Sequence, residues 1–311
     1  MMEFTNLTMQ LQSANWGWSI AFFLWFIGLS GMGMFLNGWV REKALVYLCA
    51  VASILGTLLV VSHLARLTNL PAAAFYALTS GSFNIGSWMM IGMVLLTLQC
   101  CATVFYALSL AGVFKSCEDF VLSNFFNHIT MALGVIVTIY SGFLLTQAVG
   151  VTLWNTALIP LLWIMSGMAS AISSIELMMV SGKIPAHKVL WSRRTALWTE
   201  AAELFTIFAF VHVALSSSSA AARVGAESLI DGPYSMMFWL GVILFGSIVP
   251  LSINLITRKH VALAISAVLG LAGALMLLVL ITTSAICRES RSLGPGESLL
   301  APGTLYGRLL N

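Results

Sequence analysis

The chain has 311 residues, of which 59% are hydrophobic and only 8% are charged. A soluble globular protein carries roughly 25% charged residues, so this composition excludes a water-facing surface over most of the chain. The net charge of +3 says little about partners, because the distribution of charge along the chain matters more; we expect no nucleic-acid partner. A membrane-spanning helix needs about 20 predominantly apolar residues, and eight such helices with short loops account for nearly the whole length.

The apolar segments follow one another in chain order. We expect spanning helices over residues 16–40, 44–64, 85–114, 124–148, 156–180, 191–215, 234–256 and 261–287. A Ser- and Ala-rich loop is expected over residues 216–232, and the Gly-, Pro- and Ser-rich tail over residues 288–311 is expected to be irregular. The apolar segments are too long for barrel strands, and lipid otherwise admits only helices. The sequence therefore predicts one all-α integral membrane domain over residues 1–311.

Two of the predicted helices share a short pattern. Residues 24–32 contain Leu-Trp followed by Ser-Gly-Met, and residues 162–168 contain the same two elements with a spacing two residues shorter. A duplicated four-helix unit would leave such a pattern and would arrange the spans as two four-helix bundles. Small-residue packing motifs would produce the same similarity by chance, so both interpretations stay open.

Basic residues are uneven between the two sets of loops. The loops after the first, third, fifth and seventh helices hold nine, namely Arg41, Lys43, Lys115, Lys183, Lys188, Arg193, Arg194, Arg258 and Lys259. The opposite side holds five, namely Arg66, Arg223, Arg288, Arg291 and Arg308. Because Lys and Arg favour the cytoplasmic side, we expect both termini on the outer side of the membrane.

Ionisable side chains inside a span are costly and therefore indicate function. His63 and Arg66 lie at the outer end of the second helix, on one helical face. Together they suit a quinone oxygen, although an interfacial anchor pair that reaches water would look the same. Tyr140 lies toward the outer end of the fourth helix, where a phenol can donate to a ring oxygen or serve as an interfacial belt residue.

Three glutamates lie deeper or on the inner side. Glu203 is about twelve residues into the sixth helix, roughly 18 Å from its cytoplasmic end, where a carboxyl group must be neutral, paired or hydrated. Glu200 lies one turn closer to the cytoplasm, and Glu176 lies in the inner part of the fifth helix. The three suit a proton path in an inner half-channel. Alternatively, Glu176 and Glu200 approach the headgroups and pair with nearby basic side chains.

Metal and haem sites have little support in the sequence. The five cysteines form no Cys-x-x-Cys pair, so we expect no iron–sulfur cluster and no structural zinc in this chain. His212 lies at a depth similar to His63, but this is a single pair, whereas membrane b-haems often come in twos. We therefore expect neither haem nor metal here.

Several segments together resemble the membrane subunits of the polysulfide reductase, or NrfD-like, family. The sequence YSGFLL from Tyr140, followed by LWNTALIP ending at Pro160, is similar to that family's signature. The small-residue stretch over residues 166–170 and the HLAR sequence that begins at His63 also resemble family elements. The resemblance covers about residues 16–286, and the fourth and fifth helices are its most specific part.

This resemblance implies an eight-helix anchor with a quinone site near the outer face. The residues that carry over to the quinone pocket by position are His63, Arg66, Tyr140, Asn15 and Trp16. Glu203 matches a carboxylate of the family in the sixth helix. The resemblance also implies partners, namely a ferredoxin-like subunit with four iron–sulfur clusters and a molybdopterin catalytic subunit.

The expected function is therefore that of a quinone- or quinol-binding anchor subunit of an anaerobic respiratory oxidoreductase. In a bacterial inner membrane, with both termini periplasmic, it would bind menaquinone or ubiquinone and exchange electrons with a neighbouring cluster, with or without proton translocation. Chemistry on the terminal substrate would occur in another subunit. The alternative is a secondary transporter or ion-conducting protein with Glu203 in its path, although the sequence shows no obvious helix break by Gly or Pro at the membrane centre.

Overall fold

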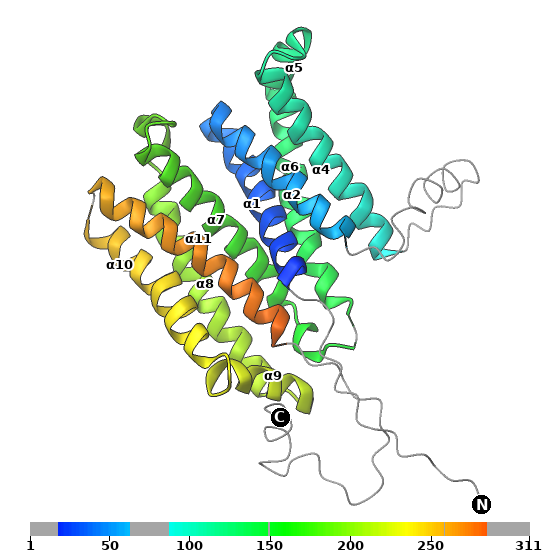
Figure 1. Cartoon of the computed structure of the whole chain (residues 1–311), viewed down its shortest axis with the longest axis vertical. Helices are drawn as coiled ribbons and strands as arrows, with labels where there is room; N and C mark the ends of the chain where they lie inside the picture. Colours follow the sequence, from blue (N-terminus) through cyan, green and yellow to red (C-terminus); the bar gives the residue numbers. More distant parts are fainter. Residues whose placement is uncertain (1–17, 63–86, 149, 258, 285–311) are drawn as a thin grey trace, which may run out of the picture.

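The computed structural model describes residues 18–62, 87–148, 150–257 and 259–284. In these ranges eight helices are long and apolar enough to cross a membrane. They are α1 (Trp18–Val40), α2 (Lys43–Ser62), α4 (Trp88–Leu110), α6 (Asn124–Thr146), α7 (Leu158–Val180), α8 (Ser192–Leu215), a π-helix (Met237–Ile248) continued by α10 (Val249–Ile256), and α11 (His260–Thr283). Figure 1 shows them as a slanted bundle. The predicted all-α membrane protein with eight spans is confirmed.

Five shorter helices connect the spans in the described part of the chain. They are η2 (Lys115–Cys117), α5 (Glu118–Leu122), η3 (Thr152–Trp154), η4 (Ala186–Val189) and α9 (Ala220–Ile230). The last of these corrects the prediction of a loop over residues 216–232. Three consecutive alanines favour a helix there, and Ala222, Ala226 and Leu229 are buried on one face, which packs on α8 and η3.

Contacts sort the eight spans into two rings of four. In the first ring α1 and α4 each contact both α2 and α6. In the second ring α7 and the π-helix with α10 each contact both α8 and α11. The rings meet where α1 contacts α7 and α11, and where α6 contacts α7. The order of contacts is the same in both rings.

Glycines allow the central helices to approach closely. A Cβ atom added at Gly134 of α6 would overlap the backbone of Gly31 in α1, and one at Gly167 of α7 would lie 3.1 Å from the Gly28 carbonyl oxygen. Small residues are typical of such crossings because lipid provides no hydrophobic drive for helix association. Within the shared Ser-Gly-Met pattern, Gly31 therefore faces α6 whereas Gly167 faces α1, which favours helix packing as the reason for that pattern.

The two ends of the bundle differ in charge. One end, called the basic end below, carries the described residues Arg41, Lys43, Lys115, Lys183, Lys188, Arg193, Arg194 and Lys259. At the opposite end α1 begins, α11 ends and α9 lies, and Arg223 is the only Lys or Arg there within the described ranges. At the basic end Lys188 Nζ lies 2.7 Å from Glu42 Oε1 and thereby links η4 to the start of α2.

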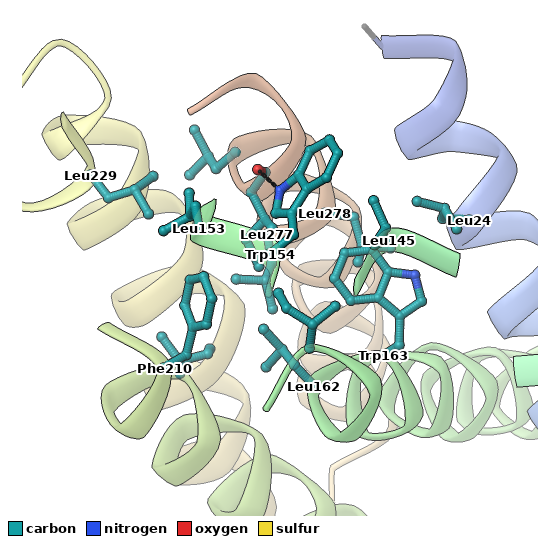
Figure 2. Close-up of a cluster of buried hydrophobic side chains, with 14 of the residues drawn as sticks. Leu24, Leu145, Leu153, Trp154, Leu162, Trp163, Phe210, Leu229, Leu277 and Leu278 are labelled. Atoms are coloured by element: carbon teal, nitrogen blue, oxygen red, sulfur yellow. Dashed lines mark hydrogen bonds between the residues drawn. The ribbon is translucent and has the colours of Figure 1, made fainter. Parts of the chain in front are cut away.

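A hydrophobic cluster fills the interior toward the opposite end. Figure 2 shows Trp154 and Trp163 in it, together with leucines from α1, α6, α7 and α11 and with Phe210 of α8. Trp154 belongs to η3, between α6 and α7, and its indole Nε1 donates to the Ile281 carbonyl oxygen at 3.0 Å. The connection between α6 and α7 is thereby tied to the end of α11.

We expect Trp154→Phe to lower the free energy of unfolding by about 1–3 kcal/mol, because the Ile281 carbonyl oxygen loses its buried donor. The measurement is the thermal midpoint of the purified protein in detergent. Trp239→Phe is the matched control, since that indole donates at the same 3.0 Å to the Ile230 carbonyl oxygen but is 41% exposed. Equal shifts in both variants would contradict the structural role of the Trp154 hydrogen bond.

Candidate functional site

The outer-side residues predicted to bind quinone are only partly described. Asn15, Trp16, His63 and Arg66 lie outside the described residues, so their roles stay predictions. Tyr140 is described and is 5% exposed. It lies near the end of α6, close to the first turn of α4.

Tyr140 is already engaged by α4. Its hydroxyl donates to the Trp88 carbonyl oxygen, and its ring stacks on the Trp88 indole with a centroid separation of 6.2 Å. Gly92 leaves room for the phenol, because a Cβ atom there would overlap the Tyr140 hydroxyl. In this arrangement the phenolic oxygen can accept a further hydrogen bond, and donation to a ring oxygen requires release of the Trp88 carbonyl.

His212 does not contribute to the interior. It lies near the end of α8 on an exposed face of that helix. His128 is likewise exposed, with Nδ1 2.6 Å from the Asn124 carbonyl oxygen. Within the described ranges no group of three or more His, Cys, Asp or Glu side chains is placed to hold a metal ion.

The three glutamates come together in the second ring. Glu176 of α7 and Glu200 and Glu203 of α8 are 3%, 8% and 4% exposed. Glu200 is the central member, because it lies within electrostatic range of the carboxyl groups of both Glu176 and Glu203. We call Glu176, Glu200, Glu203 and Asn254 the carboxyl cluster.

Asn254 of α10 joins the glutamates from a third helix. Its Nδ2 donates to Glu200 Oε1 at 3.1 Å, and the residue is fully buried. Four oxygen atoms here have no hydrogen-bond partner within the described part of the chain, namely Glu200 Oε2, Glu203 Oε1, Asn254 Oδ1 and Ser166 Oγ. Because buried polar atoms are normally hydrogen-bonded, these oxygens retain capacity to accept hydrogen bonds, for example from water.

No cation of the described ranges neutralises the carboxyl cluster directly. The two salt bridges in those ranges join Lys43 to Glu118 and Lys188 to Glu42, so Glu176 and Glu200 do not form the ion pairs considered from the sequence. Arg193 is near, but it donates to the carbonyl oxygens at the end of α10, at 2.5 Å from Nε to Asn254 and 2.9 Å from Nη2 to Leu255. Its positive charge still acts on Glu176.

The carboxyl cluster extends from the basic end to the middle of the bundle. Glu200 and Glu203 are about 12 Å and about 16 Å from the start of α8, a helix roughly 36 Å long. Beyond Glu203 come Ser166 and Trp163 of α7, whose Oγ and Nε1 atoms lack partners among the described residues. Trp163 already belongs to the hydrophobic cluster of Figure 2, so the polar path from the basic end stops there.

Sequence reasoning missed Asn254, a member of the carboxyl cluster, and Ser166, which lies beyond Glu203. An asparagine within the predicted seventh helix was a signal, because polar side chains in spans are rare and usually paired. Asn254 follows the π-helix, a form that is frequent at functional sites. Its connection to Glu200 depends on the packing of α10 against α8, which the sequence does not reveal.

Eight spans that enclose a buried carboxyl cluster define a multi-pass membrane protein with a few polar groups in a mainly apolar interior. The protein belongs to the polysulphide reductase NrfD family, whose model it matches over residues 6–287. It is 22% identical over 282 residues to the protein NrfD homolog of Haemophilus influenzae, covering 79% of this chain and 84% of that protein. It is 23% identical over 278 residues to the C subunit of polysulfide reductase from Wolinella succinogenes, with the same two coverages.

Proposed function

We propose that this protein is the quinone- or quinol-binding membrane anchor of a respiratory oxidoreductase. The observation that carries the proposal is the family match over residues 6–287, which includes all eight spans. Oxidation of one quinol releases two electrons and two protons. The electrons would pass to an iron–sulfur cluster of a partner subunit, and the protons would leave through groups of this chain.

The name of one relative indicates that proteins of this family work with partner subunits. One relative is named as the C component of polysulfide reductase, a name that places it among several polypeptides. By analogy we propose a ferredoxin-like subunit with four iron–sulfur clusters and a molybdopterin catalytic subunit as partners here. Both relatives come from bacteria, and we propose the bacterial inner membrane as the location, with the basic end in the cytoplasm.

The quinone site would lie at the opposite end, near Tyr140. The stacked pair of Tyr140 and Trp88, together with Phe143 at 6.1 Å from the Trp88 indole, offers flat apolar surface next to a phenol. The proposed quinone ligands are His63, Arg66, Tyr140, Asn15 and Trp16. No haem or iron–sulfur cluster within this chain is part of the proposal.

Proton transfer would use the carboxyl cluster. Glu203 lies near the middle of the bundle with a free Oε1 acceptor among the described residues, and Glu200 and Glu176 lead from it toward the basic end. These groups can pass a proton between the cytoplasm and the bundle centre. The hydrophobic cluster around Trp163 and Phe210 lies between this path and the proposed quinone site, so coupling of the two would require a proton to cross that cluster during turnover.

The test is His63→Ala in the assembled complex. We expect quinol-dependent electron flow to fall by about 10²-fold or more, because a positioned proton acceptor typically contributes that factor. Oxidation of an artificial quinol by the complex is measured together with co-purification of the partner subunits. His128→Ala, an exposed histidine at the basic end, is the matched control. Unchanged quinol oxidation in His63→Ala with an intact complex would remove His63 from the site.

An ion-conducting protein is the second candidate, because the carboxyl oxygens without partners in the described ranges would also suit an ion path. The two proposals differ in their need for quinol. Proton flux through the purified protein in vesicles, measured without quinol or partner subunits, decides between them. Rapid flux that Glu203→Gln abolishes would favour conduction, whereas a proton-tight protein would favour the anchor.

A further inference from the structure

A groove runs along the bundle surface between the two rings. Its volume is about 460 Å³, within the roughly 300–1,000 Å³ that holds a drug-sized ligand. Its floor is the stretch of α1 from Trp25 to Leu29, and its sides are formed by α2 and by the inner part of α7. It extends from the basic end to about the middle of the bundle, and it is distinct from the carboxyl cluster.

The wall of this groove presents a mainly apolar surface to a ligand. Val51 of α2 is 54% exposed at its edge, and Trp25 and Phe26 of α1 are half-buried in its floor. The polar groups in the wall are satisfied within the protein, since Trp25 Nε1 donates to Ser170 Oγ at 3.1 Å and Ser174 Oγ donates to the Ser170 carbonyl oxygen at 2.8 Å. Such a wall suits a hydrocarbon chain.

One charged side chain lines the groove among the described residues, namely Lys183. It follows the end of α7, where Gly182 adopts a φ of +73°. The Lys183 amide donates to the Met178 carbonyl oxygen at 2.9 Å, and the Gly182 amide donates to that of Met179 at 3.0 Å. This is a Schellman motif, so the backbone of Lys183 is fixed at the mouth of the groove.

Lys183 is available to a ligand. Its side chain is exposed, and neither salt bridge within the described ranges involves it. A lysine at the basic end of an intramembrane groove lies at headgroup depth, where basic pockets between helices bind anionic lipid headgroups. A cation at the mouth and an apolar channel behind it match an amphiphile with a negative head and a hydrocarbon tail.

We propose that this groove binds one anionic phospholipid, with its phosphate at Lys183 and one acyl chain against Trp25, Phe26 and Val51. The occupant is a phospholipid rather than a quinone, because the ammonium group attracts a negatively charged phosphate more strongly than the carbonyl oxygen of a neutral quinone. The lipid would fill the surface between the two rings and stabilise their contact across α1 and α7. The site is independent of the proposed quinone chemistry.

The experiment is native mass spectrometry of the purified full-length protein. The protein in detergent is given an equimolar mixture of phosphatidylglycerol and phosphatidylcholine, and the lipid retained by each variant is counted. We expect the unmodified protein to retain more phosphatidylglycerol than phosphatidylcholine. In Lys183→Gln the ratio of the two retained lipids should fall about fivefold, the factor associated with one lysine near a membrane surface. Lys115→Gln, at the same end but outside the groove, should keep it.

A second variant tests the proposed binding of the acyl chain of the lipid. Val51→Trp fills the groove from an exposed position and should reduce retention of both lipids, whereas Leu58→Trp, at a 59% exposed position on the same helix, should not. Equal retention of the two lipids by the unmodified protein, or full phosphatidylglycerol preference in Lys183→Gln, would overturn the proposal. Displacement of the bound lipid by a water-soluble quinone analogue would also overturn it, because the groove would then be a quinone site.

Discussion

Glu203→Gln is expected to slow proton-coupled quinol turnover by about 10²-fold, the lower bound of what a positioned proton-transfer group contributes. Glutamine keeps the size of the side chain but cannot release and regain a proton. The KM for quinol should change little, because Glu203 lies near the middle of the bundle and Tyr140 lies toward its opposite end. The measurements are steady-state quinol oxidation and the number of protons moved per quinol in vesicles that contain the complex.

The matched control for this variant is Glu227→Gln. Glu227 is an exposed carboxylate on α9, at the end away from the carboxyl cluster. Its neutralisation should leave turnover and proton stoichiometry unchanged. Normal turnover in Glu203→Gln, with a thermal midpoint like that of the unmodified complex, would show that the carboxyl group has only a structural role.

Gly134→Val is expected to be the most damaging change to the fold. A side chain at this position would overlap the backbone of Gly31, and neither backbone can move without separating α1 from α6. Overpacking typically costs about 1–3 kcal/mol and more where backbone must shift, so the yield of monodisperse protein and its thermal midpoint in detergent should both fall sharply.

Gly150→Val is the corresponding control. A Cβ atom added at Gly150 meets no atom of the described residues within 4 Å, so a larger side chain there should be tolerated. A Gly134→Val protein that purifies with the thermal midpoint of the control would contradict close backbone contact between α1 and α6. Gly31→Val should behave like Gly134→Val, because both glycines belong to the same crossing.

The sequence was most informative about where the spans lie. The predicted ranges agree with the described helices to within a few residues, as for residues 124–148 against Asn124–Thr146. It was less informative about the connections, where α9 replaced an expected loop. In a surface segment a few buried alanines decide the outcome, and such contacts leave little hydrophobic signal in the sequence.

For the site, the sequence selected three carboxyl groups within the spans but did not reveal their surroundings. It left open whether Glu176 and Glu200 reach the headgroups or face the interior. The structure buries both and supplies Asn254 as a partner of Glu200. In the structure the Tyr140 hydroxyl also donates a hydrogen bond to the Trp88 carbonyl oxygen. The phenol can therefore donate to a quinone oxygen only after that hydrogen bond is released.

The sequence by itself determined that the protein crosses the membrane eight times and that one end is basic, because both depend on composition along the chain. Only the tertiary structure decided which side chains face one another. Spanning helices are apolar nearly all round, so their periodicity does not identify an inward face. Their rotation is set by contacts such as Gly31 with Gly134, and those contacts bring Glu176, Glu200 and Asn254 together from three separate helices.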